Sequence, residues 1–278
     1  PSPVDLPEGL GGGPAVLALG GELKSTICLA RDGQGTLSQH LGDLEDARTT
    51  EEYERTVALY LDILQVAPEV LAVDRHPDYR STRLGRDWAA RDGLALEPVQ
   101  HHHAHAASVL AENGWRPDHG RVLGISLDGL GYGEDGTIWG GELLLADYLG
   151  FERVGHLKPA PMPGGTRAIL EPWRNTWAHL HTHLGWEETL QRWGGLEPVA
   201  WLAGQPVDVL AGMVARGLNS PRASSAGRLF DAVAAALGVE RGAVSYEGQA
   251  AIELEALAAR APVKVGAYPF GIQDRNGE

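Results

Sequence analysis

The stretch ALEPVQHHHAHAASVLAENG, residues 95–114, decides the fold, because it joins a strand to a helix at a cluster of histidines. Residues 95–100 have the pattern of a short strand. The helix that follows begins on four histidines: His101, His102, His103 and His105. A strand that leads directly into a helix is typical of α/β proteins.

Outward from this stretch, strand patterns dominate the first half of the chain and helical patterns the second. Residues 15–30 predict two strands joined by a tight turn at Gly20 and Gly21. Further strands are predicted at residues 69–73, 121–129 and 137–147, and helices at 49–65, 82–91, 166–184, 206–218, 226–238 and 247–261. Thr49 and Glu52 predict a capping box at the first of these helices. This order indicates an α/β protein with two lobes and a cleft between them.

Residues 1–13 are rich in Pro and Gly and show no periodicity, so we expect a linker or tail that continues from a longer chain. Residues 14–278 then form the domain itself. We expect its first lobe to extend to about residue 120, and the remainder to form the second lobe.

Composition excludes several classes of function. The net charge of −14 argues against nucleic-acid binding, which needs clustered Lys and Arg. No apolar run approaches the roughly 20 residues of a membrane-spanning helix. The single cysteine, Cys28, cannot form an internal disulfide, so we expect a cytoplasmic protein. Any bound metal must therefore be held by histidines and carboxylates.

The histidine cluster has the spacing of a metal site. On a helix, His101 and His105 project from one face, as two ligands of a single cation do. Imidazole suits Zn or Fe(II), and oxygen ligands complete the coordination. Asp128, at the end of the strand 121–129, is the nearest candidate, while a solvated helix start is the alternative interpretation. A second run, with His179 and His183 at the same spacing, is expected to be a packing or surface feature.

Glycine-rich turns suggest a phosphate-binding site. The backbone N–H groups of Gly20 and Gly21 can approach an anion closely, and Lys24 would add charge. The turn DGLGYGEDG, which contains Gly129 and Gly131, has the same character. Ordinary structural turns remain the alternative, because most tight hairpins contain glycine.

Taken together, these stretches resemble the HypF carbamoyltransferase family of nickel–iron hydrogenase maturation factors. The matching segments follow the family order from residue 15 to about residue 260. They are LALGGELKSTICLA, HLGDLED, DRHPDYRSTRLGR, VQHHHAHAASVLAE, SLDGLGYGEDGTIWGGELLLAD, VGHLKPAPMPGG, SSAGRLFDAVAAALGV and SYEGQAAIELEALA. The match is to the family's C-terminal domain, which is similar to the threonylcarbamoyladenosine synthase subunit. It implies an actin/Hsp70-like (ASKHA) fold with a nucleotide cleft, whose second lobe is incomplete at the C-terminus.

The resemblance also implies roles for individual residues. His101, His105 and Asp128 correspond to metal ligands, and Lys24 would meet the phosphate or carbamoyl end of the substrate. The nucleotide side would be formed by three acidic or glycine residues and by the glycines of the two turns. They are Asp231 toward the ribose, Glu247 and Gly248 beside the nucleoside, and Gly20, Gly21, Gly129 and Gly131.

The family's reaction starts from carbamoyl phosphate and ATP and proceeds through carbamoyl-adenylate. The domain that this chain resembles passes the carbamoyl group to the C-terminal cysteine of the partner HypE, where it becomes the cyanide ligand of the hydrogenase. A metal would act as a Lewis acid in that transfer. The segments that form carbamoyl-adenylate and a late nucleotide-binding loop have no counterpart in the sequence. O-carbamoylation of a small molecule, or a non-catalytic metal-bearing docking module, are the alternatives.

Overall fold

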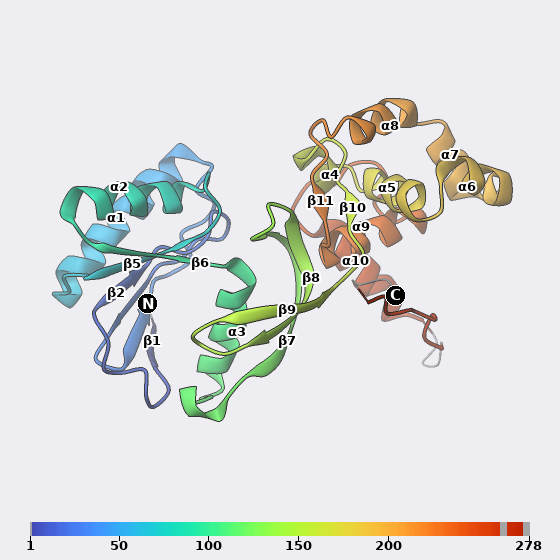
Figure 1. The fold of residues 1–278 in the computed structure, drawn as a ribbon. Coiled ribbons are helices and arrows are strands. Elements are labelled where there is room, and N and C mark those ends of the chain that lie inside the picture. The colour runs from blue at the N-terminus through green and yellow to red at the C-terminus, as the bar shows by residue number, and fades with distance from the viewer. Residues whose placement is uncertain (1, 262–265, 275–278) are drawn as a thin grey trace.

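The computed structural model describes residues 2–261 and 266–274. It contains two β-sheets that form separate lobes, and helix α3 (His101–Glu112) lies where the lobes meet (Figure 1). A group of helices covers the end of the second sheet that lies farthest from the first lobe. The predicted α/β class and the division into two lobes are confirmed.

The first lobe is a six-stranded sheet in the order β1-β4-β3-β2-β5-β6. Its strands are β1 (Ser2–Asp5), β2 (Val16–Ala18), β3 (Cys28–Arg31), β4 (Gln34–Leu37), β5 (Val70–Asp74) and β6 (Ala95–Val99). Strands β2, β5 and β6 are parallel to one another. Helix α1 (Ala47–Leu64) leads from β4 into β5, and α2 (Arg80–Asp92) connects β5 to β6. Leu17 and Leu71 of the sheet pack against Tyr53 of α1 to form the core.

Three local predictions in this lobe are wrong. Strands β2 and β3 are not joined by a tight turn at Gly20 and Gly21, because residues 19–27 lie between them. Residues Ser2–Asp5, expected in a linker, form an edge strand that pairs antiparallel with β4. Helix α1 begins earlier than residue 49, and its N-cap is Asp46, whose carboxylate accepts hydrogen bonds from the backbone N–H groups of Arg48 and Thr49. Because Asp46 already satisfies these free N–H groups, the predicted capping box of Thr49 and Glu52 does not form.

The second lobe is built on three antiparallel strands, β7 (Val122–Tyr132), β8 (Ile138–Ala146) and β9 (Phe151–His156). The short strands β10 (Ala160–Pro161) and β11 (Arg222–Ala223) extend this sheet through β8. Helix α3, which the sequence assigned to the first lobe, packs chiefly against β7 and β8. A single 3-10 turn, Pro117–His119, links α3 to β7 among the described residues.

The remaining helices follow β10. They are α4 (Thr166–Leu170), α5 (Trp173–His183), α6 (Trp186–Trp193), α7 (Glu197–Ala203), α8 (Val207–Ala215), α9 (Ala226–Ala236) and α10 (Gln249–Ala258). The helix predicted over 166–184 is split in two, because Pro172 cannot continue a helix and instead precedes α5. Within the described part of the chain, no single helix is long and apolar enough to cross a membrane. The pair α7 and α8 meets the criteria of length and composition only when taken together, across a bend of 74°.

Close packing of α2 on the first sheet gives a test of the fold. A Cβ atom added at Gly85 of α2 would lie 2.4 Å from Cγ1 of Val73 and 2.8 Å from Cδ1 of Leu19. We expect Gly85→Ala to lower the free energy of unfolding, because an overpacking cost of about 1–3 kcal/mol exceeds the gain in helix propensity of about 1 kcal/mol. Chemical denaturation measures the change.

The matched control is Gly212→Ala in α8, where an added Cβ meets no atom within 4 Å. This variant should be more stable than the unaltered chain, because only the helix-propensity gain remains. Stabilisation of the same size at Gly85 would contradict the packing of α2.

Candidate metal centre and nucleotide side

The helix α3 starts directly at the end of β6, which brings its first turn to the seam between the lobes. Gln100 is its N-cap and accepts a hydrogen bond from the backbone N–H of His103 at 2.9 Å. The amide of the same side chain donates to the carbonyl of Tyr132, at the end of β7, at 3.2 Å. Gln100 therefore fixes the start of the helix and ties it to the second sheet.

Three imidazoles of α3 converge on one carboxylate oxygen of β7. Oδ2 of Asp128 lies 3.2 Å from Nε2 of His101, 3.4 Å from Nε2 of His102 and 3.6 Å from Nε2 of His105. The Nε2 atoms of His101 and His105 are themselves 3.2 Å apart. His101, His105 and Asp128 thus form a group whose ligand atoms all lie within 4.8 Å of one another, as the sequence predicted.

A β-bulge aims Asp128 at the histidines. The pairing of β7 with β8 shifts register between Leu127 and Gly131, so the residues between them leave the regular ladder. Such a bulge redirects a side chain that would otherwise follow the strand's alternation. The backbone N–H of Gly129 donates to Oδ1 of Asp128 at 2.6 Å, which leaves Oδ2 facing the imidazoles. The glycine that follows Asp128 therefore orients this carboxylate.

Asp74 orients His101 from the other lobe, and sequence reasoning did not identify it. Its Oδ2 accepts a hydrogen bond from Nδ1 of His101 at 2.8 Å, and its side chain is buried. In the neutral ring, a proton held on Nδ1 in this way leaves the lone pair of Nε2 directed at Asp128. The position of Asp74 depends on the strand pairing, because β5 and β6 are parallel neighbours and Asp74 pairs with Val99 just before the helix begins.

His102, the second histidine of α3, is fully buried beside Asp128. It fits there because residue 131 is a glycine. A Cβ atom at Gly131 would lie 2.2 Å from Cε1 of His102 and 3.0 Å from Cδ2 of His101. Gly131, predicted to contact the cofactor, therefore has a packing role in this structure: it admits the histidines to the site.

The electrostatics of the cluster favour a cation. Burial alone would raise the pKa of Asp128, but the three imidazoles outweigh it and hold the pKa of this carboxyl well below its usual range. Burial likewise opposes the charged form of His101, yet the nearby carboxylates of Asp128 and Asp74 raise its pKa to about 9. Without a metal, the proton on His101 therefore balances part of the negative charge of the two carboxylates. A divalent ion would take over this role, and its binding would release the proton.

Two atoms of the cluster support the metal interpretation directly. Nε2 of His102 and Oδ2 of Asp128 are buried and have no hydrogen-bond partner among the described residues. Buried polar atoms normally have hydrogen-bond partners, so two such atoms without one, beside shared imidazoles, fit a site that binds a metal ion. Two or three imidazole nitrogens with one carboxylate oxygen is a donor set that suits Zn or Fe(II).

The residues expected on the nucleotide side lie across the seam from one another. Nζ of Lys24, in the turn after β2, is 2.9 Å from Oε2 of Glu247, which precedes α10. Gly248 has a positive φ of 75° and starts that helix. Both charged groups are more than half exposed, so the ion pair is weak and can be replaced by a ligand.

Asp231, which was expected to contact the ribose, pairs with an arginine of its own helix in this structure. It is buried in α9, and its Oδ2 lies 2.8 Å from Nη2 of Arg228, one turn earlier. Burial raises the pKa of Asp231, although the charge of Arg228 opposes the shift. The Nε and Nη1 atoms of Arg228 are buried without a partner in the described residues. In this structure Asp231 therefore faces Arg228.

The predicted phosphate-binding glycines differ in what they offer. Gly20 has a φ of 69°, and a Cβ there would lie 2.3 Å from the carbonyl oxygen of Thr26, so this turn requires glycine. Gly21 meets no atom within 4 Å and is open to a ligand. The N–H of Gly129 is already donated to Asp128, and is therefore engaged in the structure.

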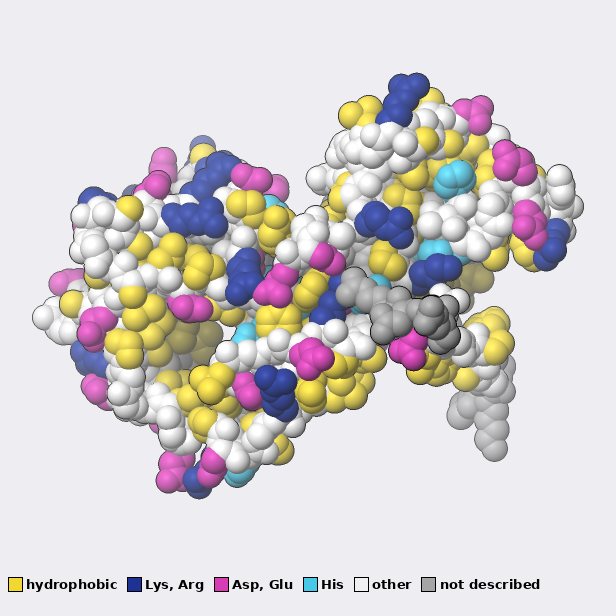
Figure 2. All heavy atoms as spheres, viewed as in Figure 1, with side chains coloured by type: hydrophobic (Ala, Val, Ile, Leu, Met, Phe, Trp, Pro, Cys, Tyr) yellow, Lys and Arg dark blue, Asp and Glu magenta, His cyan; other side chains and the backbone are white. Residues whose placement is uncertain are grey.

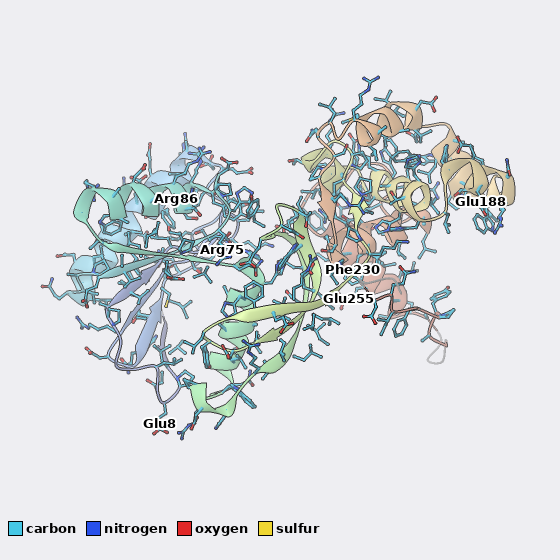
Figure 3. The ribbon with its side chains drawn as sticks, in the orientation of Figure 1. Glu8, Arg75, Arg86, Glu188, Phe230 and Glu255 are labelled. Carbon is cyan, nitrogen blue, oxygen red and sulfur yellow. The ribbon has the colours of Figure 1, made fainter. Side chains whose placement is uncertain are left out.

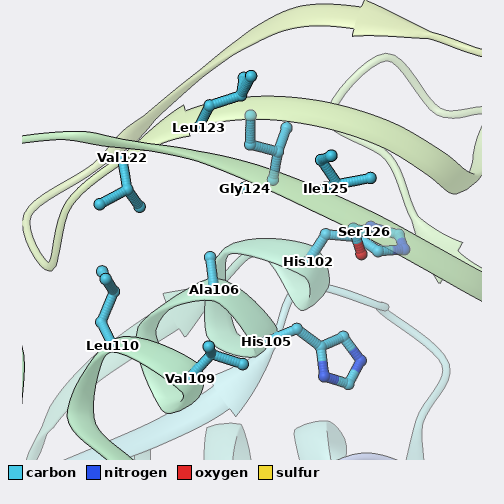
Figure 4. Close-up of a pocket in the computed structure, with 11 residues that line it drawn as sticks. His102, His105, Ala106, Val109, Leu110, Val122, Leu123, Gly124, Ile125 and Ser126 are labelled. Atoms are coloured by element: carbon cyan, nitrogen blue, oxygen red, sulfur yellow. The ribbon is translucent and has the colours of Figure 1, made fainter. Parts of the chain in front are cut away.

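A cavity of about 250 Å³ adjoins the histidines between α3 and β7 (Figure 4). His102 and His105 form one end, and the rest of the lining is mostly aliphatic, including Val109, Leu110 and Val122. Such a lining suits an apolar group better than a phosphate.

An ion pair also joins the two lobes. Arg75, in the loop after β5 (Figure 3), pairs with Glu134 of the β7–β8 turn.

The second histidine run behaves as a packing feature. His181 stacks on Trp177 with ring centroids 4.6 Å apart, and His179 lies 5.4 Å from His183. Burial and the neighbouring His183 lower the pKa of His179 to about 4. No carboxylate joins them in a metal-ligating group among the described residues.

Two family models match the chain. Residues 12–112 match the HypF Kae1-like domain, and residues 124–278 match the second subdomain of the carbamoyltransferase Kae1-like domain. The chain is 49% identical to the carbamoyltransferase HypF of Rhodobacter capsulatus, over 93% of this chain and 34% of that protein. It is 46% identical to HypF2 of Cupriavidus necator, over 88% of this chain and 29% of that protein.

The solved structures that the chain resembles come from the same family. Full-length HypF in the phosphate- and nucleotide-bound form superposes with a TM-score of 0.87 at 34% identity, over 99% of this chain and 34% of that chain. HypF of T. kodakarensis gives a TM-score of 0.82 at 33% identity, over 95% of this chain and 34% of that one. The chain thus spans about a third of the length of these relatives. With its two sheets in the Kae1-like (ASKHA) arrangement, it belongs to the HypF carbamoyltransferase family and represents that family's Kae1-like domain.

Proposed function

We propose that this chain is a carbamoyl-transfer domain of nickel–iron hydrogenase maturation and works in the cytoplasm. It would accept carbamoyl-adenylate, made from carbamoyl phosphate and ATP, and pass the carbamoyl group to the C-terminal cysteine of a HypE-like partner. The observation that carries the proposal is the convergence of His101, His102 and His105 on Asp128, at the seam between lobes in a chain of the HypF family.

The residues of the seam suit the two ends of such a substrate. His101, His105 and Asp128 would hold a divalent ion, which supplies Lewis-acid polarisation of the carbamoyl or phosphate oxygen. Lys24 would leave its ion pair with Glu247 to meet the phosphate, since exposed pairs of this kind are worth little. Glu247 and Gly248 are then free to approach the nucleoside.

The transfer itself exchanges one acyl bond for another. The partner's thiolate sulfur attacks the carbamoyl carbon, the C–O bond to the adenylate phosphate breaks, and AMP leaves with the electron pair. The thiol proton goes to solvent. Asp74 contributes by holding His101 in one orientation, so the geometry of the site does not have to be reorganised during the step.

Two other functions use the same residues. A small-molecule hydroxyl would replace the thiolate in an O-carbamoyltransferase. A docking module would keep the metal and the partner but would not turn over. The segments DRHPDYRST and PMPGG favour the maturation factor over the first of these.

Metal retention tests the ligand assignment. We expect the chain, purified anaerobically and loaded with Zn(II) or Fe(II), to retain metal through His101, His105 and Asp128. His101→Ala, His105→Ala and Asp128→Asn should each lose it, because each removes a donor atom. Asp74→Asn should weaken affinity about 10- to 100-fold, because it frees the His101 ring. Elemental analysis after gel filtration and competitive chelator titration measure both effects.

His181→Ala is the matched control, because it also removes a helical histidine but lies against Trp177. It should retain the metal of the unaltered chain. Equal loss in His181→Ala and His101→Ala would show that the metal is bound nonspecifically.

Carbamoyl transfer is tested with the chain, carbamoyl-adenylate and a purified HypE-like partner. We expect the partner to gain one carbamoyl group at its C-terminal cysteine, with AMP released in equal amount, and His101→Ala to abolish both. Intact-mass spectrometry and nucleotide chromatography follow the two products. A partner whose terminal cysteine is replaced by serine is the control and should remain unmodified.

Each alternative gives a different result in this assay. A partner that binds but gains no carbamoyl group, with no AMP released, would support the docking module. AMP released only when a small hydroxyl compound is added would support the O-carbamoyltransferase. Either outcome contradicts the proposed transfer to a thiol.

A further inference from the structure

A buried polar network outside the histidine cluster links the second sheet to Asp128. Glu142 of β8 is its centre, and its side chain has no exposed surface. One oxygen, Oε2, accepts from Nε of Arg153 at 2.6 Å. The other, Oε1, accepts from the backbone N–H groups of Gly140 at 3.0 Å and Gly141 at 3.2 Å, and from the hydroxyl of Ser224.

Arg153 of β9 completes the network. Its Nη2 donates to Oγ of Ser224 at 3.2 Å, and its Nη1 donates to Asp135 at 3.1 Å. The guanidinium also lies 4.1 Å above the ring of Trp139, whose own ring faces that of His102 at 6.2 Å. Strand β9, strand β8 and the segment that precedes α9 are thus joined through one carboxylate.

Ser225 links the network around Glu142 to the bulge of β7. It follows Ser224 directly, is the N-cap of α9, and accepts from the backbone N–H of Arg228 at 3.0 Å. Its hydroxyl also lies against the carbonyl oxygens of Gly129 and of Asp128, the latter at 3.2 Å. These carbonyls belong to the bulge that leaves the β7–β8 ladder, so Ser225 supplies the hydrogen bonding that the ladder does not.

Glycines let the backbones approach closely enough for this contact. A Cβ atom at Gly140 would lie 2.6 Å from the carbonyl oxygen of Asp128, and one at Gly141 would lie 2.5 Å from that of Ser224. A Cβ atom at Gly227 would lie 3.0 Å from Cα of Gly129. The bulge of β7, the strand β8 and the start of α9 are therefore packed backbone to backbone (Figure 1).

From these contacts we infer that Glu142 and Arg153 are positioning residues for Asp128: they fix the Ser224–Ser225 segment, which fixes the bulge that aims the carboxylate at the histidines. Neither side chain reaches the proposed metal position. A buried ion pair adds little net stability compared with apolar residues, and specificity of geometry is a better explanation of this one. The inference rests on the proposed metal site only for its affinity measurement.

The experiment compares Glu142→Gln with the unaltered chain by two measurements. Zn(II) affinity is measured by competitive chelator titration. Hydrogen–deuterium exchange is followed by mass spectrometry in peptides that cover residues 127–131 of the metal-free chain. We expect a loss of Zn(II) affinity of about 10- to 100-fold, as for other partners that orient ligands, and faster exchange in the bulge. Ser224→Ala, which removes only the connecting hydroxyl, should change both in the same direction and serves if Glu142→Gln does not fold.

Glu171→Gln is the matched control. Glu171 also pairs with a buried arginine, Arg174, which lies over the ring of Trp173 at 5.1 Å, but this pair is in the helical region away from the seam. It should lower the melting temperature while leaving Zn(II) affinity and exchange in the bulge unchanged.

Unchanged exchange in both Glu142→Gln and Ser224→Ala would overturn the inference, as would an equal loss of Zn(II) affinity in Glu171→Gln. If the unaltered chain binds no Zn(II), the proposed metal site fails, and the exchange measurement alone decides whether Glu142 positions the bulge.

Discussion

The carboxylate of Asp128 is the point on which the two lobes of this protein are organised. It is half-buried, it has one oxygen fixed by its own following N–H, and its other oxygen faces three imidazoles. A buried negative charge is costly unless it is compensated, and the three imidazoles that face Asp128 provide this compensation. Because His101 is also bound to Asp74 of the first sheet, compensation of this one charge couples both lobes.

The two sheets contain the same arrangement of three consecutive strands. In each, three strands run antiparallel, β2-β3-β4 in the first and β7-β8-β9 in the second. In the first sheet β2 pairs with the parallel strand β5, which pairs with β6, and Asp74 at the end of β5 accepts the hydrogen bond from His101. In the second sheet, the position next to β7 that corresponds to β5 is occupied by no strand among the described residues.

Basic and acidic side chains are interspersed over the visible face of both lobes (Figure 2).

The candidate ligands His101, His105 and Asp128 could be identified from the sequence because each belongs to a short local pattern. His101 and His105 are one helical turn apart, so helical periodicity places them on one face. Asp128 was chosen because it precedes a glycine at the predicted end of the strand 121–129, although in the structure it lies at a bulge within β7. Asp74, His102 and Glu142 could not be identified in that way. Their roles depend on which strands become neighbours and on glycines that permit close approach, such as Gly131 and Gly140.

The errors in the fold have the same origin. Residues Ser2–Asp5 have no strand periodicity, but their backbone pairs with β4 about thirty residues later, and such long-range pairing leaves no local signal. The cap was placed at Thr49 and not at Asp46, because Thr49 and Glu52 have the spacing of a capping box. The strands β2, β3, β5, β6, β7 and β8, most helices and the presence of two lobes were predicted, since hydrophobic periodicity reports burial of one face. The short strands β4, β10 and β11 were not predicted.

The central claim is that one cation binds between the histidines and Asp128. Anomalous diffraction from crystals of the zinc-loaded chain, recorded on both sides of the zinc absorption edge, tests it most directly. The account predicts one strong peak at about 2.0–2.2 Å from Nε2 of His101, Nε2 of His105 and Oδ2 of Asp128. A peak at His179 and His183 instead, with none beside Asp128, would contradict it.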